Sequence, residues 1–170
     1  MTDLIGILSR THDTGTVEFD RVYDTGIDDL WAAITSPHRL VRWFAPVRGD
    51  LVEGGEYEIL FDEDDPDQRT WGRIVRCDPP HELVIGWESP GDPAPSRVDV
   101  ALVAEGPRTR LRLIHSGLTH AQDVGHAAGW EVYIRQLEDE LAEVDTTTRP
   151  SWWGRWNGFV EAYRDRLGQS

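Results

Sequence analysis

The chain of 170 residues contains no lysine and a single cysteine, Cys77. One cysteine cannot form an internal disulfide, so the cysteine content gives no sign of an oxidising compartment. No apolar run approaches the ~20 residues of a membrane-crossing helix, and the first residues lack the basic segment and apolar core of a secretory signal. The length suits one domain. These features predict a cytoplasmic protein that does not bind membranes.

Positive charge is scarce: the 17 basic residues, all Arg, stand against 31 acidic residues, and the formal net charge is −14. An acidic surface repels phosphate backbones, so we expect no nucleic acid partner. The segment from Arg149 onward is different, because its four Arg outnumber Glu161 and Asp165. This mildly basic tail could dock on the acidic body or on a second subunit, or it could be an ordinary surface helix.

The common motifs of catalytic, phosphate and metal sites are also missing. No Gly-x-Ser-x-Gly turn is present. The glycine pair 54–55 lacks the Lys and Ser/Thr of a phosphate loop, and the acidic run 62–67 lacks the glycine and spacing of a calcium loop. His115, His120 and His126 match no zinc spacing, and we place the last two in a loop before a long helix. We therefore predict no metal, no cofactor and no assigned catalytic residue.

Alternation of apolar and polar residues predicts about six antiparallel strands joined by short loops. A loose arm over residues 1–15 precedes the first strand, 16–23. In the run 56–61, Tyr57, Ile59 and Phe61 share one face. Further strands are predicted over 71–77, 83–87, 98–104 and 109–115.

Helical patterns lie on both sides of these strands. Two short helices are predicted after the first strand, one near Asp28 and one with Pro37 in its first turn. A long helix over 125–144 has an apolar stripe, and its charged residues, Glu131 among them, fill the other faces. The stripe consists of Trp130, Ile134, Leu137, Leu141 and Val144.

A final helix is predicted after the linker 146–150, with Ser151 as its cap. Its aromatic residues recur at spacings of four and three, so they share one face: Trp152, Trp156, Phe159 and Tyr163. We expect this face to be buried against protein, because soluble monomers seldom expose a large apolar patch. Packing on its own domain, a homodimer interface and membrane-surface binding are the alternatives, in that order.

The order of elements predicts an α+β helix-grip fold, in which a curved antiparallel sheet wraps around the long C-terminal helix. A sheet with one apolar face needs a cover, and one long amphipathic helix supplies it. We divide the chain into an arm (1–15), a helix-grip domain (16–145), and a linker with an amphipathic tail helix (146–170). The sheet and the helix would leave a cavity between them.

An ordered set of short pieces resembles the SRPBCC (START and birch-pollen-allergen-like) superfamily, in the branch named for the C-terminal domain of the activator of heat-shock protein 90 ATPase. The pieces are Trp31-Ala32-Ala33 with Ser36-Pro37, Leu40 and Arg42-Trp43-Phe44, Gly54-Gly55 before Tyr57, Gly72-Arg73-Ile74, Cys77-Asp78-Pro79-Pro80 with Leu83 and Trp87, Thr109-Arg110-Leu111, His115-Ser116-Gly117, and Gly129-Trp130 with Leu137. The resemblance covers roughly 16–144 and implies the helix-grip fold. It leaves function open, because a fold does not fix a function.

Inward-facing residues near the expected cavity are the candidate ligand-binding set: Trp43, Tyr57, Ile59, Phe61, Trp87, Leu113, His115, Trp130 and Ile134. A cavity of this kind has apolar walls and a few orienting polar groups, although the same residues could form an ordinary packed core. We expect a binding protein for a small apolar or amphipathic molecule, without catalysis, and a homodimer is one open alternative for its assembly. The resemblance also implies two alternatives, a co-chaperone-like partner of a heat-shock ATPase and a cyclase- or hydratase-like enzyme.

Overall fold

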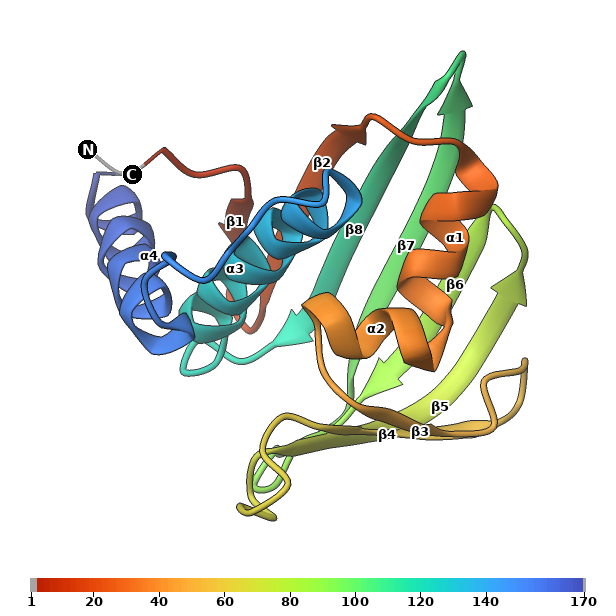
Figure 1. Ribbon diagram of the computed structural model, residues 1–170. Helices are drawn as coiled ribbons and strands as arrows, with labels where there is room; N and C mark the ends of the chain where they lie inside the picture. Colours follow the sequence, from red (N-terminus) through yellow and green to blue (C-terminus); the bar gives the residue numbers. More distant parts are fainter. Residues whose placement is uncertain (1–2, 170) are drawn as a thin grey trace.

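A single curved antiparallel sheet of eight strands wraps around helix α3 in the computed structural model, which describes residues 3–169 (Figure 1). The strand order is β1-β2-β8-β7-β6-β5-β4-β3. The strands are β1 (Ile7–Arg10), β2 (Gly15–Tyr23), β3 (Val47–Gly49), β4 (Glu56–Leu60), β5 (Arg69–Asp78), β6 (Glu82–Trp87), β7 (Ser96–Glu105) and β8 (Arg108–Leu118). The helices are α1 (Ile27–Thr35), α2 (Pro37–Trp43), α3 (Asp123–Leu141) and α4 (Trp152–Gly168). The predicted helix-grip fold is confirmed.

Side-chain alternation places one face of each long strand in the core. In β4, Tyr57 and Ile59 are buried while Glu56 is exposed. Val100 of β7 lies opposite Leu113 of β8, and both are buried. This inward face is the one that α3 covers.

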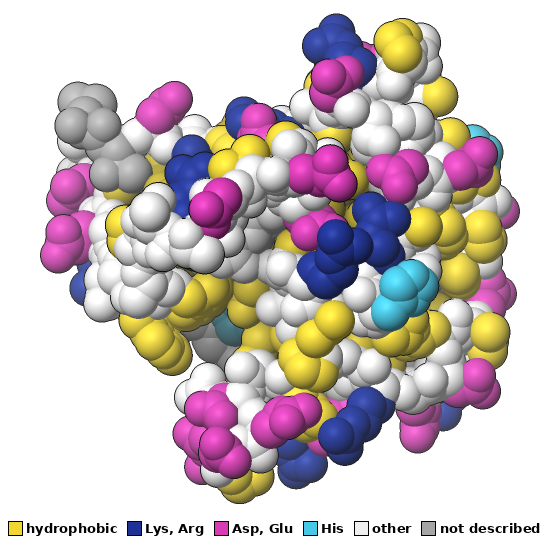
Figure 2. Space-filling model, viewed as in Figure 1, with side chains coloured by type: hydrophobic (Ala, Val, Ile, Leu, Met, Phe, Trp, Pro, Cys, Tyr) yellow, Lys and Arg dark blue, Asp and Glu magenta, His cyan; other side chains and the backbone are white. Residues whose placement is uncertain are grey.

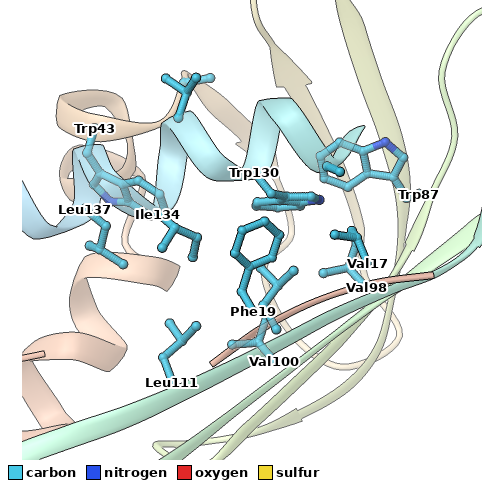
Figure 3. Packing of buried hydrophobic residues seen from close by; sticks show 14 of the residues in the cluster. Val17, Phe19, Trp43, Trp87, Val98, Val100, Leu111, Trp130, Ile134 and Leu137 are labelled. Atoms are coloured by element: carbon cyan, nitrogen blue, oxygen red, sulfur yellow. The ribbon is translucent and has the colours of Figure 1, made fainter. Parts of the chain in front are cut away.

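Helix α3 contributes its apolar stripe to the core. Figure 3 shows Trp130, Ile134 and Leu137 pointing from the helix toward side chains of the sheet, and all three are buried. Leu141 is half-buried, whereas Val144 lies beyond the end of the helix and is exposed. The predicted stripe is therefore correct except at its C-terminal end.

The N-terminal arm is not a loose segment as predicted, because residues 7–10 form the edge strand β1, paired with β2. Arg10 donates to the buried carboxylate of Asp123 from Nε at 2.7 Å and from Nη2 at 2.8 Å. These bonds connect β1 to the first turn of α3. The strand β3 was also not predicted, because three residues are too few to show an alternation.

The side chain of Glu131 lies inside the protein, although the sequence placed it on a solvated face of the long helix. It is fully buried, and one carboxylate oxygen accepts the backbone N–H groups of Ile5 and Gly6 at 2.6 and 2.7 Å. The same oxygen accepts the Tyr163 hydroxyl at 3.1 Å, and the second oxygen accepts Arg135 Nε at 3.2 Å. One buried carboxylate thus connects the N-terminal segment, α3 and α4.

Helix α4 packs along α3 of the same chain and lies beside the N-terminal segment (Figure 1). Ser151 caps the helix, its hydroxyl accepting the Gly154 N–H at 3.1 Å. Phe159 and Tyr163 are buried, and Trp152 and Trp156 are half-buried. The prediction that this face packs on protein is confirmed, and the protein is its own chain. None of the helices in residues 3–169 is long and apolar enough to cross a membrane.

Candidate functional site

Two spaces lie between the sheet and α3. The inner space is a cavity of about 110 Å³ with walls of apolar side chains. Its lining is Ile34, Leu40, Trp43, Phe44, Val47, Leu51, Tyr57, Ile59, Ile74, Leu83, Ile85, Trp87, Val98, Val100, Leu111, Leu113, Trp130, Ile134 and Leu137. Apolar cavities of this kind stay dry and accept apolar molecules.

The outer space is a groove of about 650 Å³, which combines aromatic rings with polar groups. Its lining is Phe44, Phe61, Asp62, Asp67, Gln68, Arg69, Thr70, Trp87, Ser89, Ala121, Gln122, Gly125, His126, Gly129, Trp130, Tyr133, Trp152, Trp153 and Trp156. In Figure 2 a hollow with hydrophobic walls opens between α4 and the tip of the β4–β5 hairpin, where acidic side chains gather. This groove has the size and the mixed lining of ligand pockets.

Three aromatic residues line both spaces and so form the partition between them: Phe44, Trp87 and Trp130. The rings of Phe44 and Trp130 are stacked, with centroids 5.9 Å apart and planes at 6°. The Trp87 and Trp130 centroids are 5.6 Å apart. A ligand that reaches from the groove into the cavity has to pass these rings.

His115 lies behind the partition in a chain of hydrogen bonds. The donor and the acceptor of each bond can be assigned from the chemistry of the groups. Trp130 Nε1 donates to His115 Nδ1 at 3.0 Å, because an indole nitrogen can only donate. The neutral imidazole then carries its proton on Nε2 and donates to Ser96 Oγ at 2.8 Å. Ser96 Oγ in turn donates to the Trp87 carbonyl at 3.3 Å. His115 therefore does not accept a proton from Ser96, and this arrangement does not activate the serine as a nucleophile.

His126 lies within α3, so the predicted position in a loop before the helix is wrong. Its Nδ1 donates to the Gln122 carbonyl at 3.0 Å, and its ring centroid is 5.0 Å from that of His115. Burial lowers the pKa of both histidines, most strongly that of His115, where the neighbouring His126 lowers it further. His120 is exposed and contacts the Thr11 carbonyl at 3.2 Å, so the three histidines do not converge.

The predicted ligand-binding residues fall into three groups. Most line the inner cavity, and Phe61 lines the groove. His115 lines neither space, but it accepts a hydrogen bond from Trp130, which lines both. Those on the inner cavity are Trp43, Tyr57, Ile59, Trp87, Leu113, Trp130 and Ile134. The predicted ligand-binding set lacks Phe44, Tyr133 and His126. It also lacks the tail tryptophans, for which the sequence left packing on the domain, a homodimer interface and membrane-surface binding as alternatives. The position of Tyr133, three residues after Trp130 on the same helix, was the one signal that pointed to it.

Stability is expected to fall as the pH drops below about 6.5, the ordinary histidine pKa. The unfolded chain takes up protons there, whereas the folded chain keeps His115 and His126 neutral to lower pH because of their burial. Stability present above pH 6.5 is therefore lost on acidification, by up to about 1.4 kcal/mol per pH unit for each histidine. Urea unfolding between pH 7.5 and 5.5 measures this slope.

The matched variants are His115→Gln and His126→Gln, each of which should reduce the slope whatever it does to stability at pH 7.5. His38→Gln, which replaces an exposed histidine, is the control for the substitution itself. Equal slopes in all four proteins would contradict the assignment of the two buried histidines.

Comparison with known proteins gives one family and many similar structures. The family described as Activator of Hsp90 ATPase homolog 1-like protein matches residues 24–142. CalU16 from Micromonospora echinospora is 29% identical, with a TM-score of 0.76 over 94% of this chain and 95% of that protein. The protein encoded by gene BPP1335 from Bordetella parapertussis is 23% identical, with a TM-score of 0.72 over 98% of this chain and 95% of its own.

A third similar structure is PFC0360w, an HSP90 activator from Plasmodium falciparum, at 19% identity and a TM-score of 0.63. The similarity covers 75% of this chain and 96% of that protein. No curated protein matches the chain. The family match leaves out β1, β2 and α4, so the groove wall formed by Trp152, Trp153 and Trp156 lies outside the matched region.

Proposed function

Because this chain belongs to the family of Activator of Hsp90 ATPase homolog 1-like proteins, with a sheet that grips one helix, we propose that it binds a small apolar or amphipathic molecule between the sheet and α3. The observation that carries the proposal is the pair of adjoining spaces, an apolar cavity of about 110 Å³ beside an aromatic groove of about 650 Å³. Ligand pockets commonly measure ~300–1,000 Å³ and combine apolar walls with a few polar groups.

The two spaces suit different parts of one molecule. The inner cavity, with apolar walls, favours an alkyl or small ring substituent, since a polar group there would lose its hydrogen bonds to water. The outer groove is lined by both aromatic rings and polar side chains, which favours an aromatic or amphipathic portion. The ligand expected from this arrangement has an apolar end and a more polar end.

Titration with naphthalene, followed by tryptophan fluorescence and thermal shift, tests the proposal. Trp87 and Trp130 line both spaces, so binding should change their emission and raise the melting temperature. Gly129→Leu adds a branched side chain to the groove wall and should weaken binding by about tenfold, equivalent to 1.4 kcal/mol. A Cβ at this position would lie 4.0 Å from Trp152, in ordinary van der Waals contact, and the atoms beyond it would extend into the space beside that ring.

Gly158→Leu is the matched control, because position 158 lies on α4 away from the groove and a Cβ there meets nothing within 4 Å. It should bind naphthalene as the unmodified protein does. Native mass spectrometry of the purified protein would detect any small molecule that co-purifies with it. Absence of binding to every apolar probe, together with a ligand-free mass, would refute the proposal.

A co-chaperone-like role is the second candidate, and the family match is the observation that favours it. One similar structure belongs to an HSP90 activator, although at 19% identity it supports the fold alone. The measurement is the ATPase rate of an Hsp90-type protein with and without this chain. A rate increase that survives Gly129→Leu would favour the co-chaperone role, because that activity would not depend on the groove.

A further inference from the structure

The indole N–H of Trp87 is a buried donor without an acceptor. The side chain is 5% exposed and lines the groove, and Nε1 has no hydrogen-bond partner within residues 3–169. Figure 3 shows the nitrogen on the edge of the ring that is turned away from Trp130. Buried donors in native proteins are nearly always paired, so an unpaired one on a groove wall indicates an acceptor supplied from outside the chain.

His126 offers the complementary group close by. Its Nδ1–H is used by the Gln122 carbonyl, so the neutral ring presents Nε2 as an acceptor, and Nε2 has no partner in the described part of the chain. Burial lowers the pKa of this histidine, which keeps the lone pair free at neutral pH, although Asp92 and Asp123 act in the opposite direction. The Trp87 and His126 rings are edge-on to each other, with centroids 6.3 Å apart.

The other polar side chains at this end of the groove already bond to one another. Thr70 and Ser89 share a hydrogen bond of 2.8 Å between their hydroxyls. Gln122 donates to Asp92 and accepts from Thr119. Two buried N–H donors on the groove wall, Trp87 Nε1 and Trp152 Nε1, have no hydrogen-bond partner within residues 3–169, and Trp87 is the one whose ring lies edge-on to His126.

The walls around this pair consist of ring faces. Trp152 and Trp156 of α4 lie nearly parallel, with planes at 16° and centroids 6.3 Å apart. Tyr133 and Phe61 are also close to parallel, at 29° and 6.2 Å. Flat ring faces favour a flat ligand, because aromatic pairs gain energy from offset stacking beyond their apolar contact.

The geometry points to a planar aromatic ligand that carries a hydroxyl group, with the hydroxyl oxygen accepting from Trp87 Nε1 and its proton donated to His126 Nε2. A hydroxyl is the smallest group that both accepts and donates, so one atom satisfies both side chains. The inference rests on the proposed function, since it specifies the ligand class of the same groove. It adds the polar contact that selects among aromatic molecules of equal size.

Three probes of similar shape separate the two hydrogen bonds. Naphthalene can neither accept nor donate a hydrogen bond, 2-methoxynaphthalene can only accept one, and 2-naphthol can do both. With the unmodified protein at neutral pH, 2-naphthol should bind about tenfold or more tighter than naphthalene, and 2-methoxynaphthalene should fall between them. This comparison needs no variant and does not depend on how a mutant folds. Fluorescence titration and isothermal calorimetry give the dissociation constants.

Two variants then assign each bond. Trp87→Phe keeps an aromatic ring and removes the N–H, so the affinities of 2-naphthol and 2-methoxynaphthalene should both fall relative to that of naphthalene measured in the same variant. His126→Phe removes the acceptor, so 2-naphthol and 2-methoxynaphthalene should bind this variant with about equal affinity. Trp71→Phe is the control, because Trp71 lines neither space.

The failures of the two proposals look different. If all three probes bind the unmodified protein with equal affinity, the hydroxyl assignment is wrong and the apolar binding site remains. If none of them binds, the proposed function fails and the hydroxyl assignment fails with it. Equal losses for all three probes in Trp87→Phe or His126→Phe would indicate a general loss of shape and would also overturn the assignment.

Discussion

Deletion of residues 146–170 is expected to lower the melting temperature sharply and to cause aggregation. Phe159, Val160 and Tyr163 are buried between α4 and the rest of the chain, and each contributes about 1.5–3 kcal/mol through the removal of apolar surface from water. Together they represent a large share of the ~5–15 kcal/mol by which a domain is stable. The deletion also exposes the matching face of α3. Thermal unfolding measures the melting temperature, and light scattering and elution volume measure aggregation.

A milder pair of variants separates packing from the loss of a whole segment. Phe159→Ala should cost about 3–5 kcal/mol in the full-length chain, because it removes a buried aromatic ring. Glu161→Ala, an exposed position on the same helix, should cost less than about 0.5 kcal/mol. If the truncated chain keeps the melting temperature, solubility and elution volume of the full-length chain, α4 is not a structural part of the fold. A homodimer remains a prediction, and the elution volume of the full-length chain tests it.

Replacement of Glu131 by Leu is expected to destabilise the protein by about 3–5 kcal/mol. The substitution removes the acceptor of two backbone N–H groups, those of Ile5 and Gly6, and leaves these donors buried and unpaired. It also removes the hydroxyl bond of Tyr163 and the ion pair of Arg135. The free energy of unfolding in urea measures the loss, and protection of the Gly6 amide from hydrogen exchange should fall at the same time.

Two further variants calibrate this prediction. Tyr163→Phe removes one of the four hydrogen bonds and should cost about 1 kcal/mol. Glu138→Leu replaces a half-exposed glutamate on the same helix, whose ion pair with Arg21 should contribute about 1 kcal/mol or less. A Glu131→Leu protein as stable as Glu138→Leu would show that the buried carboxylate does not hold the three segments together.

Much of the sheet and of α3 was predictable because the pattern and the burial agree residue by residue. Tyr57 and Ile59 alternate with glutamates in the sequence, and they are buried where the glutamates are not. For Glu131 the pattern predicts the wrong environment. Its charge and its helical position are typical of a solvated residue, and only the approach of Ile5, Gly6 and Tyr163 makes its burial stable. Contacts between segments far apart in the sequence produce no periodic pattern of apolar residues, so the sequence does not reveal them.

The candidate site was predictable only in part, for the same reason. Inward faces of strands identified Tyr57, Ile59 and Trp87, because period-two alternation gives the direction of each side chain. Phe44 lies just after α2, where no period applies, and yet it is part of the partition between the two spaces. The groove also depends on where α4 docks, and helical periodicity predicts a buried face without predicting its partner.

The seam between β2 and β8 has a consequence for how the chain is made. Every other strand pair joins neighbours in the sequence, whose hairpins close over loops at modest entropic cost. β2 pairs with β8 only after the intervening strands have been synthesised. Until then the apolar side chains Val17 and Phe19 lack their final cover on a nascent chain, and an unpaired strand edge is a site of aggregation. The topology itself therefore concentrates the risk of misfolding during translation on β2, whose partner β8 is synthesised last among the strands of this sheet.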